Sequence, residues 1–298
     1  MVDVPLVSVV IATYNMGAYL PLAIKSVLDQ TYKNLEILVI DDGSTDDTAK
    51  VLHPFLKDAQ IRYIHQTNGG QACAKNRGAQ ESRGEFVAFL DADDIWIPSK
   101  LEEQIPLFFC SGSVGVVFSQ YIEIDAEGVL GKSVNSGFSR GQVSGPLLIF
   151  NFIGFSTSVV RKQCFDCLGY FREDLDMGID YELWLRFSAR YEFDYVDRPL
   201  VYYRVWPGQM SKNYQRRYLN GIKIMRDFLS EYPGMVDKKI QRDAWAHTYS
   251  GFADCIHRSD QGIRLALKEY LRALSFSPTY LPAWKGIVKV FLGLPDKT

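Results

Sequence analysis

VSVVIATYNMGAYLPLAIKSVLDQTYKNLEILVID, residues 7–41, is the part of the sequence from which the fold class follows. Its two short apolar runs, Val7–Ala12 and Leu35–Ile40, are rich in Val and Ile and do not alternate with polar residues. Such runs are typical of strands covered on both faces of a sheet. The segment between them, Tyr19–Gln30, has the apolar spacing of a helix. A strand, a helix and a strand in this order indicate a parallel pair joined by a right-handed crossover.

The same order continues outward through the first third of the chain. Further strands are expected at Ile61–Ile64 and Phe86–Leu90, and further helices at Thr48–Lys57 and Gln71–Ser82. Repeated strand and helix segments of this kind predict an α/β fold, in which helices flank a mostly parallel sheet.

The remainder of the chain becomes helical toward its end. Added strands are expected within residues 114–134, and a helix over Ile179–Arg190. From about Gln215 onward, segments separated by Pro and Gly have the pattern of amphipathic helices. These segments are Arg216–Glu231, Lys238–His257, Gly262–Ser275 and Tyr280–Leu292. A turn-rich link at 207–214 predicts a main domain over residues 1–210 and a helical C-terminal region over 211–298.

The composition argues against several classes of protein. The 298 residues are 47% hydrophobic and 23% charged, with a formal net charge of −2, so there is no basic excess for binding nucleic acid. The N-terminus lacks the basic start of a signal peptide, and Gly, Pro, Asn and Ser interrupt the longest apolar stretch, residues 145–160. Cys164 and Cys167 form a single CxxC without a second pair, which disfavours a zinc site. We therefore expect a cytoplasmic protein without a transmembrane helix.

Polar side chains follow three of the expected strands. In chain order they are Thr13, Tyr14 and Asn15, then Asp41 and Asp42, then Asp91, Asp93 and Asp94. The carboxyl ends of parallel strands meet at one edge of a sheet, where ligands bind, so we expect the three loops to share one rim. Neither a G-x-G-x-x-G turn nor a P-loop follows the first strand, so a nucleotide would not be held by a glycine-rich turn.

The acidic residues of these loops suggest a cation that arrives with phosphate. Mg²⁺ and Mn²⁺ prefer oxygen ligands, and often take one or two carboxylates together with phosphate oxygens of a substrate. Each loop also has a structural alternative, because Asp41 and Asp42 could shape a turn and Asp94 could stand near a helix start. Capping does not account for Asp91 and Asp93 together, so the sequence DADD favours the cation.

Three blocks of the sequence, residues 7–48, 68–98 and 169–191, resemble family 2 glycosyltransferases with the GT-A fold. They carry TYN and DDGS, then NGGQACAKNRG and DADD, and finally GIDYELWLR. Taken in order, the resemblance covers roughly residues 5–206. It implies a Rossmann-like, mostly parallel sheet flanked by helices, to which the C-terminal helices are an extension.

The resemblance also implies a set of nucleotide-binding positions and a metal site. The nucleotide-binding positions are Thr13, Tyr14, Asn15, Asp41, Asp42, Lys75, Asn76 and Asp91. Tyr14 and Asp42 would contact the base, and Asp91 the ribose or the sugar. Asp93 would bind Mn²⁺ or Mg²⁺. Lys75 stands where these enzymes usually have Arg, which keeps the charge but loses the bidentate geometry.

Asp180 matches the catalytic base of the family, at the start of the expected helix. The alternative is that it is a first-turn acid stabilised by the helix dipole. The chain departs from the family at two positions, since Ile179 replaces a Glu and Trp206 stands where related enzymes often have His. The second departure implies that a protein ligand to the metal is absent. The Q-x-x-R-W signature of processive enzymes is missing as well, which favours the addition of a single sugar.

We therefore expect a glycosyltransferase that moves a sugar from a nucleotide-diphosphate sugar with inversion and with the help of a metal ion. UDP is the expected nucleotide only because the family resemblance suggests it. The acceptor would be a hydroxyl of a glycan or of a lipid-linked glycan, in polysaccharide biosynthesis. A binding module that senses sugar nucleotides without turnover, and a nucleotidyltransferase, are the alternatives. The C-terminal helices leave open a peripheral contact with the inner face of a membrane, although apolar helix faces are more often packed core.

Overall fold

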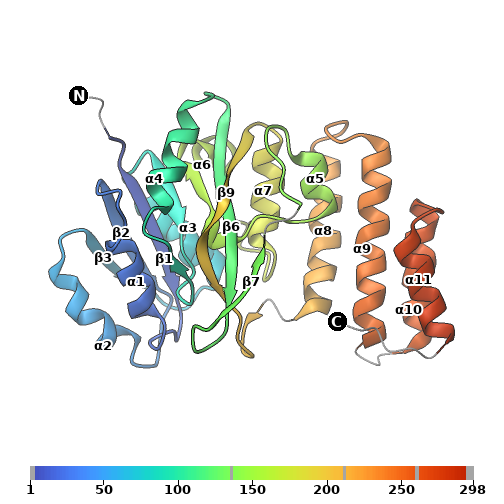
Figure 1. Cartoon of the computed structure of the whole chain (residues 1–298), viewed down its shortest axis with the longest axis horizontal. Helices are drawn as coiled ribbons and strands as arrows, with labels where there is room; N and C mark the ends of the chain where they lie inside the picture. Colours follow the sequence, from blue (N-terminus) through green and yellow to red (C-terminus); the bar gives the residue numbers. More distant parts are fainter. Residues whose placement is uncertain (1–3, 135–136, 211–212, 259–261, 293–298) are drawn as a thin grey trace. The chain divides into compact units, whose positions relative to one another are not determined.

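The computed structural model describes residues 4–134, 137–210, 213–258 and 262–292 (Figure 1). Two compact units make up the chain. The first consists of residues 1–143 and 152–207, and the second of residues 144–151 and 208–298. The chain therefore enters the second unit briefly at residue 144, long before its C-terminal helices begin.

A single sheet runs through the first unit in the order β3-β2-β1-β4-β8-β6-β9-β5, and β7 pairs with β6. Its strands are β1 (Val7–Thr13), β2 (Leu35–Asp41), β3 (Ile61–His65), β4 (Phe86–Phe89), β5 (Ile95–Trp96), β6 (Val114–Ile124), β7 (Leu130–Val134), β8 (Val159–Arg161) and β9 (Glu192–Arg204). Its helices are α1 (Leu20–Leu28), α2 (Thr48–Leu52), α3 (Gln71–Glu81), α4 (Lys100–Gln104), α6 (Gln163–Leu168) and α7 (Ile179–Ser188). Short 3₁₀ turns lie at η1 (His53–Lys57), η2 (Ile105–Phe109) and η3 (Phe155–Thr157).

The expected α/β class and the parallel order of the first four strands are confirmed. β1 pairs in parallel with both β2 and β4, and β2 pairs in parallel with β3. Beyond β4 the sheet is mixed, because β8 runs antiparallel to β4 and β6, while β6 and β9 are again parallel. The sequence pattern did not indicate β8 or β9. β8 has only three residues, and β9 is only partly buried along its length.

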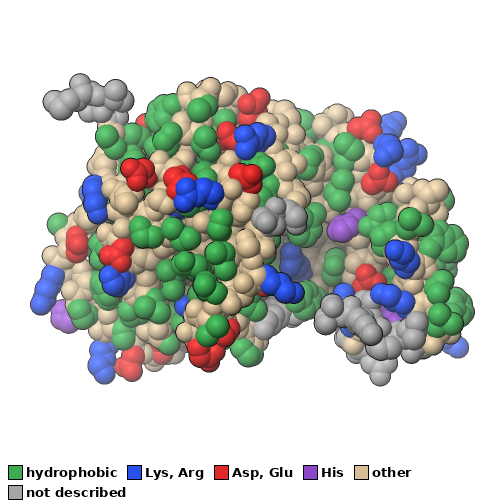
Figure 2. Space-filling view, viewed as in Figure 1, with side chains coloured by type: hydrophobic (Ala, Val, Ile, Leu, Met, Phe, Trp, Pro, Cys, Tyr) green, Lys and Arg blue, Asp and Glu red, His purple; other side chains and the backbone are tan. Residues whose placement is uncertain are grey.

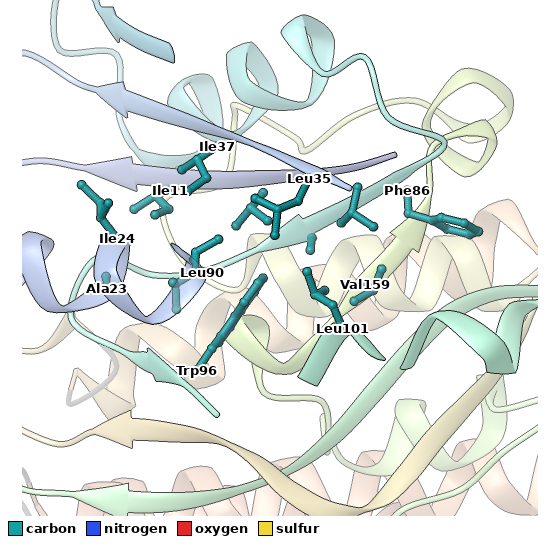
Figure 3. Packing of buried hydrophobic residues seen from close by; sticks show 14 of the residues in the cluster. Ile11, Ala23, Ile24, Leu35, Ile37, Phe86, Leu90, Trp96, Leu101 and Val159 are labelled. Atoms are coloured by element: carbon teal, nitrogen blue, oxygen red, sulfur yellow. The ribbon is translucent and has the colours of Figure 1, made fainter. Parts of the chain in front are cut away.

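The core of the first unit lies between the sheet and helices α1 and α4. Ile11 of β1, Ile37 of β2 and Ile24 of α1 are fully buried, and the Trp96 ring packs beside Leu90 (Figure 3). Burying an aliphatic side chain of this size contributes about 1.5–3 kcal/mol. The continuous apolar runs of β1 and β2 are needed because the sheet is covered on both faces.

Gly78 permits the close approach of α3 to β1, and this contact can be tested. A Cβ atom at Gly78 would lie 2.2 Å from Cγ1 of Val10 in the fully covered strand. Because neither backbone can retreat without cost, Gly78→Ala should lower the free energy of unfolding by about 1–3 kcal/mol. Urea denaturation followed by circular dichroism measures the change. Gly112→Ala in the same unit is the control, since no atom lies within 4 Å of its Cβ position. Equal stability of the two variants would contradict the tight contact.

The second unit is helical. Its helices are α5 (Ser144–Ile149), α8 (Tyr214–Glu231), α9 (Lys238–Arg258), α10 (Ile263–Phe276) and α11 (Leu281–Phe291). α9 is central and packs against each of the others, around a core that includes Tyr249, Ile256 and Tyr270. The four expected C-terminal helices are confirmed, with ends shifted by one or two residues. None of the helices within the described residues is long and apolar enough to cross a bilayer.

Candidate active site

The three polar loops meet at one rim of the sheet, as the parallel order requires. Thr13, the last residue of β1, pairs with Asp41, the last residue of β2. On the other side of β1, the amide of Leu90 donates a 3.1 Å hydrogen bond to the carbonyl oxygen of Val10, so the chain leaves β4 and enters DADD at the same edge. The expected common rim is confirmed.

The first two loops brace one another through Asn15. This residue has a positive φ of 53°, and its side-chain oxygen accepts hydrogen bonds from the amides of Thr45 (2.8 Å) and Asp46 (3.3 Å). Its own amide donates to the hydroxyl of Ser44 at 2.9 Å. Asn tolerates this backbone conformation better than most residues. Tyr14, immediately before it, is 47% exposed and therefore available to a ligand.

Asp41 and Asp42 are both buried, and their carboxylates bind the protein itself. Asp41 accepts from the amide of Ser44 at 2.8 Å and from the hydroxyl of Tyr63 at 2.7 Å. Burial, followed by the hydrogen bond to Asp41 and its charge, raises the pKa of Tyr63 to about 12. Asp42 accepts from the amides of Gly69 and Gly70, at 2.9 and 2.8 Å. Asp41 thus shapes the turn that contains it, which is the structural alternative that the sequence left open, whereas Asp42 holds the loop ahead of α3.

Asp91 forms an ion pair with Lys75. The Nζ atom of Lys75 lies 3.0 Å from Oδ1 of Asp91 and 3.7 Å from the centre of the Phe155 ring. The Lys75 side chain is only 7% exposed, whereas that of Asp91 is 35% exposed. The buried Lys75 ammonium thus offsets part of the negative charge of the DADD loop, while the Asp91 side chain remains partly exposed to solvent.

Asp93 is held by Trp206. The indole Nε1 donates a 2.8 Å hydrogen bond to Oδ2 of Asp93, and Nε of Arg204 donates at 2.8 Å to the backbone oxygen of the same residue. Burial and the neighbouring charge of Asp91 raise the pKa of Asp93, against the lowering effect of the indole. Both effects disfavour the ionised form of Asp93, so a bound cation would stabilise that form.

Asp94 has a structural role. It is 1% exposed, and its two oxygens accept from the Ser156 hydroxyl at 2.5 Å and from the amide of Arg204 at 2.8 Å. Burial, then the charges of Asp93 and Asp91, raise its pKa well above the usual value. Because both oxygens bind protein groups, Asp94 joins the DADD loop to β9 and to η3.

The chemistry of these residues fits a divalent cation that arrives with a diphosphate. Within the described part of the chain, no group of three or more His, Cys, Asp or Glu residues could hold a metal by itself. Asp93 and Asp91 are two carboxylates of one loop; Asp91 pairs with the charged Lys75, whereas Asp93 accepts a hydrogen bond from the uncharged indole of Trp206. Mg²⁺ and related ions are commonly bound by one or two carboxylates plus substrate phosphates, and this pair provides that minimum.

Asn76 anchors the segment that leads to Asp180. Its side-chain oxygen accepts from the amide of Phe171 at 2.8 Å, and its Nδ2 donates to the Phe171 carbonyl oxygen and to Glu173, both at 2.9 Å. Gln71, on the same helix, donates at 3.4 Å to the carbonyl oxygen of Asp176. Asn76 is buried, so the structure uses this expected nucleotide-binding residue to join α3 to residues 171–173.

Asp180 lies in the first turn of α7, directly after Gly178 with its φ of 77° and Ile179. Trp184 follows one turn later, and its ring centre lies 6.4 Å from that of Phe155, the ring beneath Lys75. Trp184 of α7 thereby lies beside the ring that packs against Lys75. Ile179, which stands in place of a Glu, is 2% exposed and supplies no polar group to orient Asp180.

Sequence reasoning missed Phe155, Ser156 and Arg204 as parts of this site. They contact Lys75, Asp94 and Asp93, although each is separated from its partner by more than 60 residues. No spacing rule connects such distant segments. The remaining feature of note is Thr13, whose buried hydroxyl has no hydrogen-bond partner among the described residues.

Comparison with known sequences gives a family. The family model for glycosyl transferase family 2 matches residues 8–169. An uncharacterised glycosyltransferase of Rickettsia felis is 34% identical over 227 residues, which is 76% of this chain and 37% of the relative. Chondroitin synthase of Escherichia coli is 29% identical over 235 residues, 76% of this chain and 33% of that protein. The chain thus spans about a third of the length of these curated relatives.

Solved structures show the same fold at low sequence identity. Residues 1–349 of TarS from S. aureus align with a TM-score of 0.64 and 15% identity, over 96% of this chain and 91% of that one. TarS has also been solved with UDP-GlcNAc, with a TM-score of 0.60 and 17% identity over 97% and 92% of the two chains. The mannosyltransferase PcManGT of Pyrobaculum calidifontis, in complex with GDP-Man and Mn²⁺, gives 0.58 and 16% over 98% and 88%.

Proposed function

The chain belongs to glycosyltransferase family 2, and from this premise we propose that it transfers one sugar from a nucleotide-diphosphate sugar to a hydroxyl of a glycan, free or lipid-linked. UDP is the proposed nucleotide, although the solved structures of similar fold include both UDP and GDP-Man complexes. The observation that carries the proposal is the pair of carboxylates Asp91 and Asp93, which Lys75 and Trp206 hold at the rim where β1, β2 and β4 end.

The proposed chemistry is one displacement at the anomeric carbon. Asp180 accepts the proton of the acceptor hydroxyl as the oxygen of that hydroxyl bonds to the anomeric carbon. The bond from this carbon to the diphosphate oxygen breaks, its electron pair stays on the diphosphate, and the configuration inverts.

Asp93 would hold Mn²⁺ or Mg²⁺, and Asp91 would face the ribose or the sugar of the donor. When bound, such an ion neutralises negative charge that develops on the leaving diphosphate. Lys75 and Trp206 keep the two carboxylates in place through an ion pair and a hydrogen bond. Tyr14 is exposed on the rim and is proposed to contact the base, with Thr13, Asn15, Asp41 and Asp42 shaping the pocket around it.

A sensor that binds sugar nucleotides without turnover is the second candidate, because buried Ile179 cannot orient the base and Trp206 is no metal ligand. To separate the two, the chain is incubated with a panel of sugar nucleotides and Mn²⁺, and release of nucleoside diphosphate is measured. We expect release from one donor, and its loss with EDTA. Tight donor binding without any release would instead support the sensor. Pyrophosphate release from a nucleoside triphosphate and a sugar phosphate would indicate a nucleotidyltransferase.

A further inference from the structure

Helix α11 of the second unit is apolar on two opposite faces. One face packs inward through Ala283, Gly286, Ile287 and Val290. The other points to solvent, and its exposed fractions are Leu281 66%, Trp284 49%, Val288 53%, Phe291 76% and Leu292 65%. We call these five residues the α11 stripe, since their spacing places them along one side of the helix. Singly exposed apolar residues are ordinary, but a contiguous row of five marks an interaction surface.

The rotation of α11 about its axis is determined by close packing. A Cβ atom at Gly286 would lie 2.2 Å from the Tyr270 ring of α10, so the helix approaches α10 through its glycine. Tyr270 is itself anchored by a 2.5 Å hydrogen bond from its hydroxyl to Asp254. Trp284 is held outward, because its Nε1 donates at 2.8 Å to the carbonyl oxygen of Pro278. The α11 stripe cannot turn inward without breaking these contacts.

The charge around the α11 stripe differs from that of the rest of the chain. Residues 262–292 contain five basic residues, Arg264, Lys268, Arg272, Lys285 and Lys289, and a single acidic one, Glu269, which gives a net charge of +4. The rest of the chain, with 28 basic and 34 acidic residues, carries −6. Glu269 is 6% exposed, so the described surface of α10 and α11 is basic. Figure 2 shows hydrophobic side chains gathered over these two helices, with Lys and Arg side chains among them.

We infer that the α11 stripe and its basic neighbours dock this protein on an anionic lipid surface. A row of Leu, Val, Phe and Trp bordered by Lys285 and Lys289, one turn apart, has the composition of a helix that lies in the membrane interface. Each Lys or Arg near an anionic leaflet contributes about 1 kcal/mol of attraction. A second copy of the chain fits less well, because a symmetric contact through the stripe would bring Lys285 and Lys289 of one copy close to those of the other. Docking of this kind goes beyond sugar transfer and does not depend on it.

Flotation of the intact chain with lipid vesicles tests the inference. Vesicles of phosphatidylcholine and phosphatidylglycerol, mixed two to one, are compared with vesicles of phosphatidylcholine alone. The chain should float with the mixed vesicles and not with the neutral ones, and rising salt should weaken the binding. Lys285→Glu with Lys289→Glu should reduce the binding constant by about tenfold or more. Trp284→Ser with Phe291→Ser should reduce it similarly, through the loss of apolar burial.

The control variant is Phe109→Ser, which removes a side chain of the first unit that is 62% exposed. It should bind the mixed vesicles as the unchanged chain does. Circular dichroism verifies that each variant is folded, which is favoured because Lys289 is half-buried and the other substituted residues are exposed. The inference is overturned if the chain does not float with anionic vesicles, or if the α11 variants float as well as Phe109→Ser. Sedimentation showing a dimer that Phe291→Ser dissociates would assign the stripe to a second copy instead. None of these measurements uses a sugar donor, so they can fail independently of the proposed function.

Discussion

Asp180→Asn should reduce sugar transfer by about 10³-fold, within the usual range for loss of a general base, while donor binding stays unchanged. Asn has the shape of Asp but cannot accept the acceptor proton at neutral pH. The substituted position is in the first turn of α7, and Asn76 and Gln71 hold the segment before it. The substitution should therefore leave the backbone conformation unchanged. Initial rates with the donor found in the release assay give the transfer rate, and calorimetric titration gives the donor affinity.

Asp166→Asn is the matched control, because Asp166 is likewise a first-turn acid, in α6. Both substitutions remove a carboxylate from a helix N-terminus, which costs about 0.3–1 kcal/mol of stability through the helix dipole. Only Asp180→Asn should affect transfer. If it transfers sugar at the unchanged rate and loses stability as Asp166→Asn does, then Asp180 is a helix-stabilising residue and the proposed base is wrong.

Asp93→Asn should abolish the dependence of donor binding on Mn²⁺ and lower kcat/KM by about 10²- to 10³-fold. The amide oxygen of Asn can still accept the hydrogen bond from the Trp206 indole, so the change removes charge and little else. Donor binding without metal should remain as it is in the unchanged chain. Titration of the donor with and without Mn²⁺, and rates measured against Mn²⁺ concentration, give the two quantities.

Asp29→Asn is the control for the change in net charge. Asp29 is a half-exposed carboxylate that pairs with Lys25 at the end of α1. This variant should keep the Mn²⁺ dependence of the unchanged chain. EDTA added to the unchanged chain should reproduce the loss seen with Asp93→Asn. An identical response to Mn²⁺ in both variants would mean that Asp93 does not hold the cation.

Much of the fold could be predicted from local patterns. The apolar runs that became β1, β2 and β4 are continuous because both faces of the sheet are covered, and this burial is visible in the composition of each run. Parallel order then placed Thr13, Asp41 and the DADD loop at one rim without further information. The amphipathic C-terminal helices were equally visible, because one helical face must be apolar wherever a helix packs.

The roles of individual site residues could not be predicted in this way. Asp94 binds the amide of Arg204, 110 residues away, and Asp93 binds the Trp206 indole, 113 residues away. Such partners are set by the order of the strands in the mixed half of the sheet, where β9 pairs with β6 and β5. Asn76 likewise contacts Phe171, 95 residues away.

Local periodicity was therefore sufficient for the helices, the parallel strands and the rim, because each of these depends on which side chains of a short segment avoid water. Three-dimensional packing was required to distinguish Asp94, whose two oxygens bind protein groups, from Asp91 and Asp93, the carboxylates proposed to contact the donor and the cation. It was also required to show that residues 144–151 belong to the helical unit and that the α11 stripe faces solvent. A hydrogen bond or a buried contact between distant segments depends on the whole arrangement of the chain, which no short pattern contains.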